Sequence, residues 1–322
     1  MHNRTMTRSD SPLSGDPQEF HAQITRREFI KGGVLTLATL SGASSRGAPG
    51  KTSLCSSDVL PLGRARILAS RQGLGIGDGK AEAFQKLRQS GFTRLVRQAL
   101  DQGVRYFDLL PGPAHQMIAA ALKGVPREKY TLVTNFRHPE EQVPARMLER
   151  FLGELQTDYL DAVLLGAILT RDWATESKWA ERRDLLSAAK QSGRVKAVGV
   201  SVHGWEAMQS IPKDNWVEMA MVSCNHRGTW MDGPPGKHLS ERERRDLSVP
   251  LIAVIHAAGI GIAGMKVFSH SGYRDAQDPA AERLTALRYV MALGTIDTMP
   301  IQCESIQEFN EVQNLINLLG KP

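Results

Sequence analysis

Eight short apolar runs, separated by stretches of helical periodicity, constrain the fold of this chain more than any other feature of its sequence. The runs are nearly continuous in apolar residues, as expected of strands buried on both faces. They cover Gly73–Gly77, Val104–Leu109, Thr131–Asn135, Leu160–Leu165, Ala197–Val202, Met219–Asn225, Gly261–Lys266 and Thr298–Cys303. Between them apolar residues recur with the 3.6-residue period of helices, as over Arg94–Gln102, Val143–Leu155, Arg182–Ser192 and Arg283–Leu293. This alternation predicts an α/β fold, a (β/α)8 TIM barrel of parallel strands.

Residues 1–50 are predicted to form an export signal and linker that precede the barrel. Arg26 and Arg27 stand ahead of Gly32–Leu40, an apolar run too short to span a bilayer. Small residues follow, so cleavage is expected after Ala43. Together these features resemble a twin-arginine signal, which predicts transport by the twin-arginine export machinery to the periplasm. The alternative is a basic, disordered tail.

Residues 51–322 are enough for one barrel, so no second domain is required. The net charge is +6, but basic residues are interspersed with acidic ones, as in Glu241–Asp246. That pattern favours a solvated helix face over a nucleic-acid site. Leu54 stands directly before Cys55, where a lipid anchor needs a small residue, so we expect no stable membrane anchor.

A metal site is not expected, although four ligand-type residues end predicted strands. These are His203, Cys224, His226 and Cys303, and no Cys-x-x-Cys pair is present. The strands of the two cysteines lie two apart in the predicted order, roughly 9 to 10 Å, which is too far for a disulfide. Buried free cysteines are therefore the favoured interpretation, with zinc as the minor alternative.

Asp108 is the first candidate for chemistry, because it meets the Pro/Gly-rich turn Pro111–Pro113 at the end of a predicted strand. Side chains at the carboxyl ends of barrel strands line the site in such folds. The alternative is that Asp108 caps the helix predicted over Gln116–Lys123. The strand-end position favours the functional interpretation.

The chain resembles the aldo-keto reductases over essentially all of residues 51–322. The resemblance is carried by Gly73–Gly77, Tyr106–Asp108, Leu155–Asp161, Gly193–Ser201, Gly259–Lys266 and Ala286–Tyr289, in this order and spacing. It implies a barrel that binds a nicotinamide dinucleotide across its mouth and passes hydride to a carbonyl. The substrate would be a small molecule.

The resemblance also implies a catalytic Asp, Tyr, Lys and His at strand ends, and only the first is retained. Asp108 matches the Asp, whereas the position of the tyrosine falls in Pro111–Pro113. Asn135 occupies the position of the lysine, and Gly166 occupies that of the histidine. Asn135 is kept as a candidate that hydrogen-bonds a carbonyl or a nicotinamide amide. His115 is the candidate replacement acid, and its alternative is an exposed residue in the first turn of a helix.

Asp108 without a lysine partner is expected to serve structure or ligand binding more than proton transfer. Desolvation should raise the pKa of its carboxyl unless backbone N–H groups offset the loss of the lysine. We therefore expect a hydrogen bond from Asn135 or from a backbone amide to this carboxyl.

The residues expected at the cofactor are those that match the family near the nicotinamide and the phosphates. They are Gly75, Ser201, Asn225, Lys266, Ser269, Ser305 and Glu308. Ser305 and Glu308 have the spacing of a capping box, whose alternative role is to present a helix N-terminus to a phosphate. Glu304 and Glu308 would repel a 2′-phosphate, so NAD is favoured over NADP. The leading function is an exported NAD(P)-dependent oxidoreductase with altered or weak catalysis, and the alternative is a pseudoenzyme, a ligand-binding barrel that has lost hydride chemistry and requires no cofactor.

Overall fold

The computed structural model describes residues 54–322 except 65, 78–81, 137–143, 270–271 and 322. The predicted export signal lies outside these residues. Residues 51–322 form one compact unit. Among the described residues no helix is both long and apolar enough to cross a membrane.

Eight parallel strands form the barrel, which confirms the predicted fold. They are β3 (Gln72–Ile76), β4 (Tyr106–Leu109), β5 (Thr131–Phe136), β6 (Leu160–Ile168), β7 (Val195–Val202), β8 (Met219–Ser223), β9 (Gly261–Met265) and β10 (Met299–Ile301). Their order is β10-β3-β4-β5-β6-β7-β8-β9, and a parallel bridge from Ala263 to Thr298 joins the two ends. Each predicted run overlaps one of these strands.

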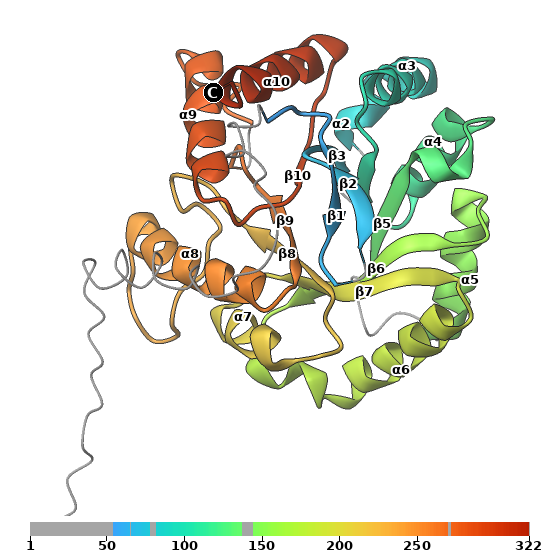
Figure 1. Ribbon diagram of the computed structural model, residues 1–322, viewed down its shortest axis with the longest axis vertical. Coiled ribbons are helices and arrows are strands. Elements are labelled where there is room, and N and C mark those ends of the chain that lie inside the picture. Colours follow the sequence, from blue (N-terminus) through green and yellow to red (C-terminus); the bar gives the residue numbers. More distant parts are fainter. Residues whose placement is uncertain (1–53, 65, 78–81, 137–143, 270–271, 322) are drawn as a thin grey trace, which may run out of the picture. The chain divides into compact units, whose positions relative to one another are not determined.

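Helices surround the strands as an outer layer (Figure 1). They are α2 (Glu82–Gln85), α3 (Arg88–Asp101), α4 (Pro113–Leu122), α5 (Pro144–Leu155), α6 (Ser177–Gln191), α7 (Trp205–Ser210), α8 (Glu241–Ala257), α9 (Pro279–Ala292) and α10 (Ile306–Leu319). Short 3-10 turns lie at η1 (Arg127–Lys129), η2 (Arg171–Ala174) and η3 (Ile211–Lys213).

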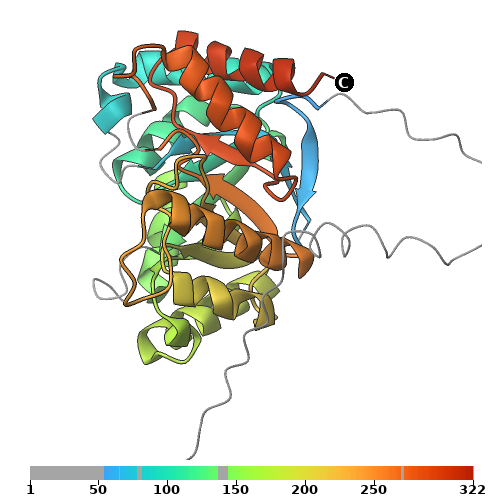
Figure 2. The ribbon, with the colours of Figure 1, turned by 90° about the vertical axis from the view of Figure 1, so that its left-hand side faces the viewer.

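A β-hairpin that the sequence patterns did not predict precedes the barrel. It pairs β1 (Val59–Leu62) with β2 (Ile67–Ser70) in antiparallel register and lies at one edge of the barrel (Figure 2). Leu62, Ile67 and Ala69 pack into the same buried cluster as the inward side chains of the strands. The hairpin therefore closes the end of the barrel at which the strands begin.

The core has two layers, because successive side chains of a strand point to opposite faces. On β5, Val133 belongs to the inner cluster, whereas Leu132 and Phe136 belong to the cluster between strands and helices. On β4, Tyr106 faces inward and Phe107 outward. This alternation decides which strand-end side chains reach the mouth.

Candidate functional site

The mouth of the barrel is lined by polar side chains that follow inward-facing apolar positions. Asp108 lies two residues after Tyr106, and Asn135 lies two residues after Val133, so both face the barrel interior. A Cβ placed on Gly166 would lie 3.0 Å from Asn135 Oδ1 and 3.5 Å from Ser201 Cβ. Strands β5, β6 and β7 therefore bring Asn135, Gly166 and Ser201 together.

Four buried polar atoms of inward-facing side chains have no hydrogen-bond partner in the described part of the chain. They are Tyr106 OH, Asp108 Oδ1, Asn135 Oδ1 and Ser223 Oγ. Buried polar groups are normally paired, and each unpaired one costs about 1–3 kcal/mol. Asp108, Asn135 and Ser223 lie at the carboxyl ends of their strands, and Tyr106 begins β4 two residues before Asp108. Such a group of unpaired atoms indicates a site that a polar ligand completes.

Tyr106 and Ser223 were not among the candidate site residues predicted from the sequence. Tyr106 is fully buried, and a Cβ on Gly73 would lie only 2.7 Å from its ring, so that glycine makes room for it. Tyr106 could have been predicted from its spacing, because residues two apart on a strand point to the same face and Tyr106 lies two residues before Asp108. Ser223 is two residues from the inward-facing Met221 and could have been found in the same way.

Burial raises the pKa of the Asp108 carboxyl from 3.8 to about 7. Burial, and then the nearby charge of Asp108, raise the pKa of the Tyr106 phenol. Asp108 Oδ1 accepts no hydrogen bond from Asn135 or from a backbone amide among the described residues, so the expected bond is not formed at this oxygen. The capping alternative also fails, because α4 begins after Gly112 without a side-chain cap. A buried carboxyl with an unpaired oxygen opposes stability, which argues for a role toward a ligand.

His115 does not line the mouth. Its Nδ1 lies 2.8 Å from Glu154 Oε2 and its Nε2 lies 2.8 Å from Thr134 Oγ1. Thr134 alternates with the inward-facing Val133, so the imidazole lies between the barrel wall and the helices. It is fully buried, and burial lowers its pKa. His115 is therefore not placed to act as the replacement acid. The alternative prediction, an exposed residue in the first turn of a helix, is also wrong, because the side chain is buried.

The expected cofactor residues differ in how far their side chains are already engaged. Gly75 is required by packing, since a Cβ there would lie 2.9 Å from Pro300 O. Asn225 holds its own turn, because its Oδ1 accepts hydrogen bonds from the N–H groups of Gly228 (2.8 Å) and Thr229 (3.1 Å). Ser201 is buried beside Asn135 and is the best placed of the three.

The loop after β9 has an unusual backbone. Lys266 and Ser269 both have φ of 59°, a left-handed conformation that costs a non-glycine residue about 1–3 kcal/mol. The Ser269 N–H donates to Lys266 O at 2.8 Å, and Lys266 Nζ lies 4.9 Å from the centre of the Trp230 ring. Residues held in such conformations cluster at functional sites, which favours a role for this loop at the mouth.

The capping role of Ser305 is confirmed, because its hydroxyl accepts a hydrogen bond from the Glu308 N–H at 3.0 Å. The Glu308 carboxylate accepts from the Glu304 N–H at 2.7 Å and pairs with Arg283 at 2.8 Å. Arg274 pairs with both Glu304 (3.2 Å) and Glu308 (3.1 Å). These arginines offset the carboxylates, so the argument that charge would exclude a 2′-phosphate does not hold.

No metal site forms in the described part of the chain, where no three His, Cys, Asp or Glu side chains gather around one point. Cys224 and Cys303 are buried free thiols, as the favoured interpretation predicted. His226 Nε2 lies 3.8 Å from a carboxylate oxygen of Glu282.

Fold and side chains together define a (β/α)8-barrel protein with unpaired polar groups at the carboxyl ends of its strands. The family model of the aldo/keto reductases matches residues 74–315. The chain belongs to the aldo/keto reductase family.

Solved structures of aldo-keto reductases resemble this fold, whereas no curated protein matches the chain. An aldo-keto reductase from Pseudomonas aeruginosa, described as putative, is 22% identical, with a TM-score of 0.65 and coverage of 83% of this chain and 97% of that one. An enzyme from Klebsiella pneumoniae in complex with NADPH is 18% identical, with a TM-score of 0.59 and coverage of 81% and 89%. A holo form from Bacillus halodurans is 18% identical, with a TM-score of 0.57 and coverage of 82% and 96%.

Proposed function

We propose that this protein is an exported, nicotinamide-dependent carbonyl oxidoreductase of low activity in which the Asp108 carboxyl donates the proton, in place of the structural or ligand-binding role expected from the sequence. The observation that carries the proposal is the set of unpaired polar atoms at the mouth, with Asp108 among them. Near neutral pH a carboxyl whose pKa is about 7 is partly protonated and therefore able to act as an acid.

The residues at the mouth fit a nicotinamide cofactor, which supplies the hydride when bound. Ser201 and Asn135 would contact its carboxamide, and the loop of Lys266 and Ser269 together with the α10 N-terminus at Ser305 would face its phosphates. The bound NADPH of the Klebsiella enzyme supports this class of ligand. Because Glu304 and Glu308 are paired with arginines, either NAD or NADP is compatible with the site.

The residues of this chain would act on a carbonyl substrate as follows. The protonated Asp108 carboxyl donates a proton to the carbonyl oxygen, and the Tyr106 hydroxyl is close enough for its pKa to respond to the Asp108 charge. The Asn135 amide orients the carbonyl but supplies no charge. Without a phenol, an ammonium or an imidazole at Pro111–Pro113, Asn135 and Gly166, turnover should be at least about 10²-fold below that of an intact tetrad.

Two assays on the purified protein test the proposal. Titration with NADH and NADPH, monitored by tryptophan fluorescence, measures dinucleotide binding. A panel of aldehydes then measures carbonyl reduction. Reduction should be slow and should decline as the pH rises through about 7, because the acid form of Asp108 is lost. Asp108→Asn should bind dinucleotide but lose turnover. Asp101→Asn, which changes an exposed carboxylate at the end of α3, is the matched control and should change neither.

Three outcomes contradict parts of the proposal. Ordinary turnover of simple aldehydes would show that the missing groups have been replaced. Dinucleotide binding without turnover would favour the binding barrel over the enzyme. Turnover that survives in Asp108→Asn would show that another group donates the proton.

A further inference from the structure

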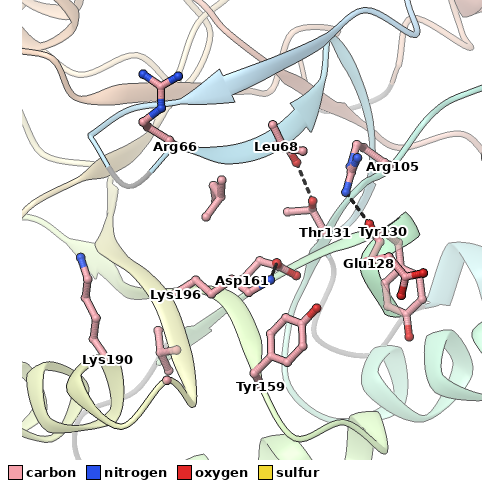
Figure 3. Close-up of a pocket in the computed structure, with 13 residues that line it drawn as sticks. Arg66, Leu68, Arg105, Glu128, Tyr130, Thr131, Tyr159, Asp161, Lys190 and Lys196 are labelled. Carbon is pink, nitrogen blue, oxygen red and sulfur yellow. Dashed lines mark hydrogen bonds and ion pairs between the residues drawn. The ribbon is translucent and has the colours of Figure 1, made fainter. Parts of the chain in front are cut away.

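A second pocket lies at the opposite end of the barrel from the mouth. It encloses about 510 Å³ and is lined by residues at the beginnings of β2, β5, β6 and β7, together with Arg105 just before β4 (Figure 3). The hairpin forms one wall, tied to the barrel by a hydrogen bond of 2.5 Å from Thr131 Oγ1 to Leu68 O. A volume of this size suits a small organic ligand.

The charges around this pocket are predominantly positive. Asp161 is contacted by two cations, Arg127 at 2.7 Å and Lys196 at 3.2 Å, which leaves one positive charge in surplus. Lys190 is neutralised by Glu218. Arg66 and Arg105 both line the pocket, and Glu128 is the remaining carboxylate there. The balance of these groups is two positive charges, which favours an anionic ligand.

Arg105 is the side chain best placed to hold an anion. One of its terminal nitrogens donates to the Glu128 backbone carbonyl at 2.7 Å, which fixes the guanidinium. Its Nε atom is buried and has no hydrogen-bond partner among the described residues. The described chain places no carboxylate within ion-pair distance of this guanidinium, so its charge is available to a ligand.

The pocket also offers apolar surface. Leu68 is 44% exposed, although its neighbours Ile67 and Ala69 are buried in the barrel, because alternation turns it outward into the pocket. Tyr159 stands opposite the hairpin in Figure 3. An apolar group that covered Leu68 would gain the free energy of removing that side chain from water.

We propose that this pocket binds a small organic carboxylate with an apolar body, the carboxylate on Arg105 and the apolar body against Leu68. The site does not depend on dinucleotide binding at the mouth, because the two lie at opposite ends of the strands. It is a ligand site on the face of the barrel that ordinarily serves stability.

Calorimetric titration of the full-length chain tests the proposal with three probes: 2-naphthoate, its neutral isostere 2-naphthamide, and inorganic phosphate. Naphthoate should bind, and naphthamide should bind about tenfold more weakly because the charge-assisted hydrogen bonds are lost. Phosphate should bind no better than naphthamide, because it lacks the apolar body. Naphthoate that binds no better than naphthamide, or shows no binding at its solubility limit, overturns the proposal.

Variants locate the binding. Arg105→Met should weaken naphthoate about tenfold and Leu68→Ser about fivefold. Arg97→Met is the matched control, since Arg97 also donates to backbone carbonyls, at 2.7 Å to Ala121 O, but lies outside the pocket. Asp108→Asn tests the mouth and should leave naphthoate affinity unchanged.

Thermal melts accompany each titration. If Arg105→Met does not fold, Arg105→Lys and the exposed Leu68→Ser still decide the question, because both should weaken naphthoate without changing the fold. Affinity that is insensitive to all three, or that is lost in Asp108→Asn, refutes the assignment.

Discussion

Replacing Asp108 by asparagine should stabilise the protein at about pH 8 and change its stability little at about pH 4. The carboxyl is 7% exposed, and one of its oxygens is unpaired in the described chain. Burial raises its pKa from 3.8 to about 7 in the folded state. The amide of asparagine has a similar shape and carries no charge at any of these pH values.

The sign follows from which state binds the proton. Below the unfolded pKa the carboxyl is protonated in both states and has no effect on the pH dependence. Between 3.8 and about 7 the unfolded chain has released the proton while the folded chain retains it, so the free energy of unfolding falls as the pH rises. Above about 7 the loss is complete.

A shift of about three pKa units corresponds to about 4 kcal/mol at 1.36 kcal/mol per unit. Since domains are stable by about 5–15 kcal/mol, this is a large share of the total. The free energy of unfolding of Asp108→Asn minus that of the wild type should therefore rise by up to about 4 kcal/mol between about pH 4 and pH 8.

Urea unfolding of both proteins at several pH values measures that difference, and subtraction removes the titration of all other groups. Asp101→Asn, which changes an exposed carboxylate outside the mouth, is the control for the substitution itself. A flat difference for Asp108→Asn would refute the reasoning, since it would mean that Asp108 titrates alike in the folded and unfolded chains.

Three further predictions concern other regions. Exchanging Arg26 and Arg27 for lysine should retain the protein in the cytoplasm, which fractionation would show; unchanged export contradicts the twin-arginine assignment. His115→Ala should lower the free energy of unfolding by about 2–4 kcal/mol without lowering turnover per folded molecule, because it removes a buried imidazole and leaves both hydrogen-bond partners unpaired. Burial lowers the pKa of His115, so the free energy of unfolding that this side chain contributes should be lost as the pH falls below 6.5, the ordinary pKa of histidine. Chemical denaturation across that range measures this; a contribution that grows as the pH falls would contradict it. Arg283→Met should cost about 3–5 kcal/mol in a thermal or urea melt, because it leaves the buried Glu308 carboxylate short of a partner; a cost no larger than that of an exposed arginine would contradict this.

The barrel was predictable because its signals are local. Each apolar run and each helical period can be recognised within a short stretch of residues, and eight alternations of strand and helix are compatible with few folds besides the barrel. The hairpin was missed because β1 and β2 are only four residues each and half of their residues face solvent or the pocket. Such short strands have too few residues for a period to stand out.

The barrel, the family resemblance, and the lack of a phenol, an ammonium and an imidazole at three strand ends can all be read from the order of the residues. Which polar groups meet depends on how the chain packs. His115 is seven residues from Asp108 in sequence, but its bonds to Thr134 and Glu154 place it outside the barrel wall. Tyr106, which was not among the candidate site residues, faces inward two residues before Asp108. The physical reason is that a residue's type is set along the chain, whereas its partners, its burial and hence its pKa depend on contacts between strands and helices distant in sequence.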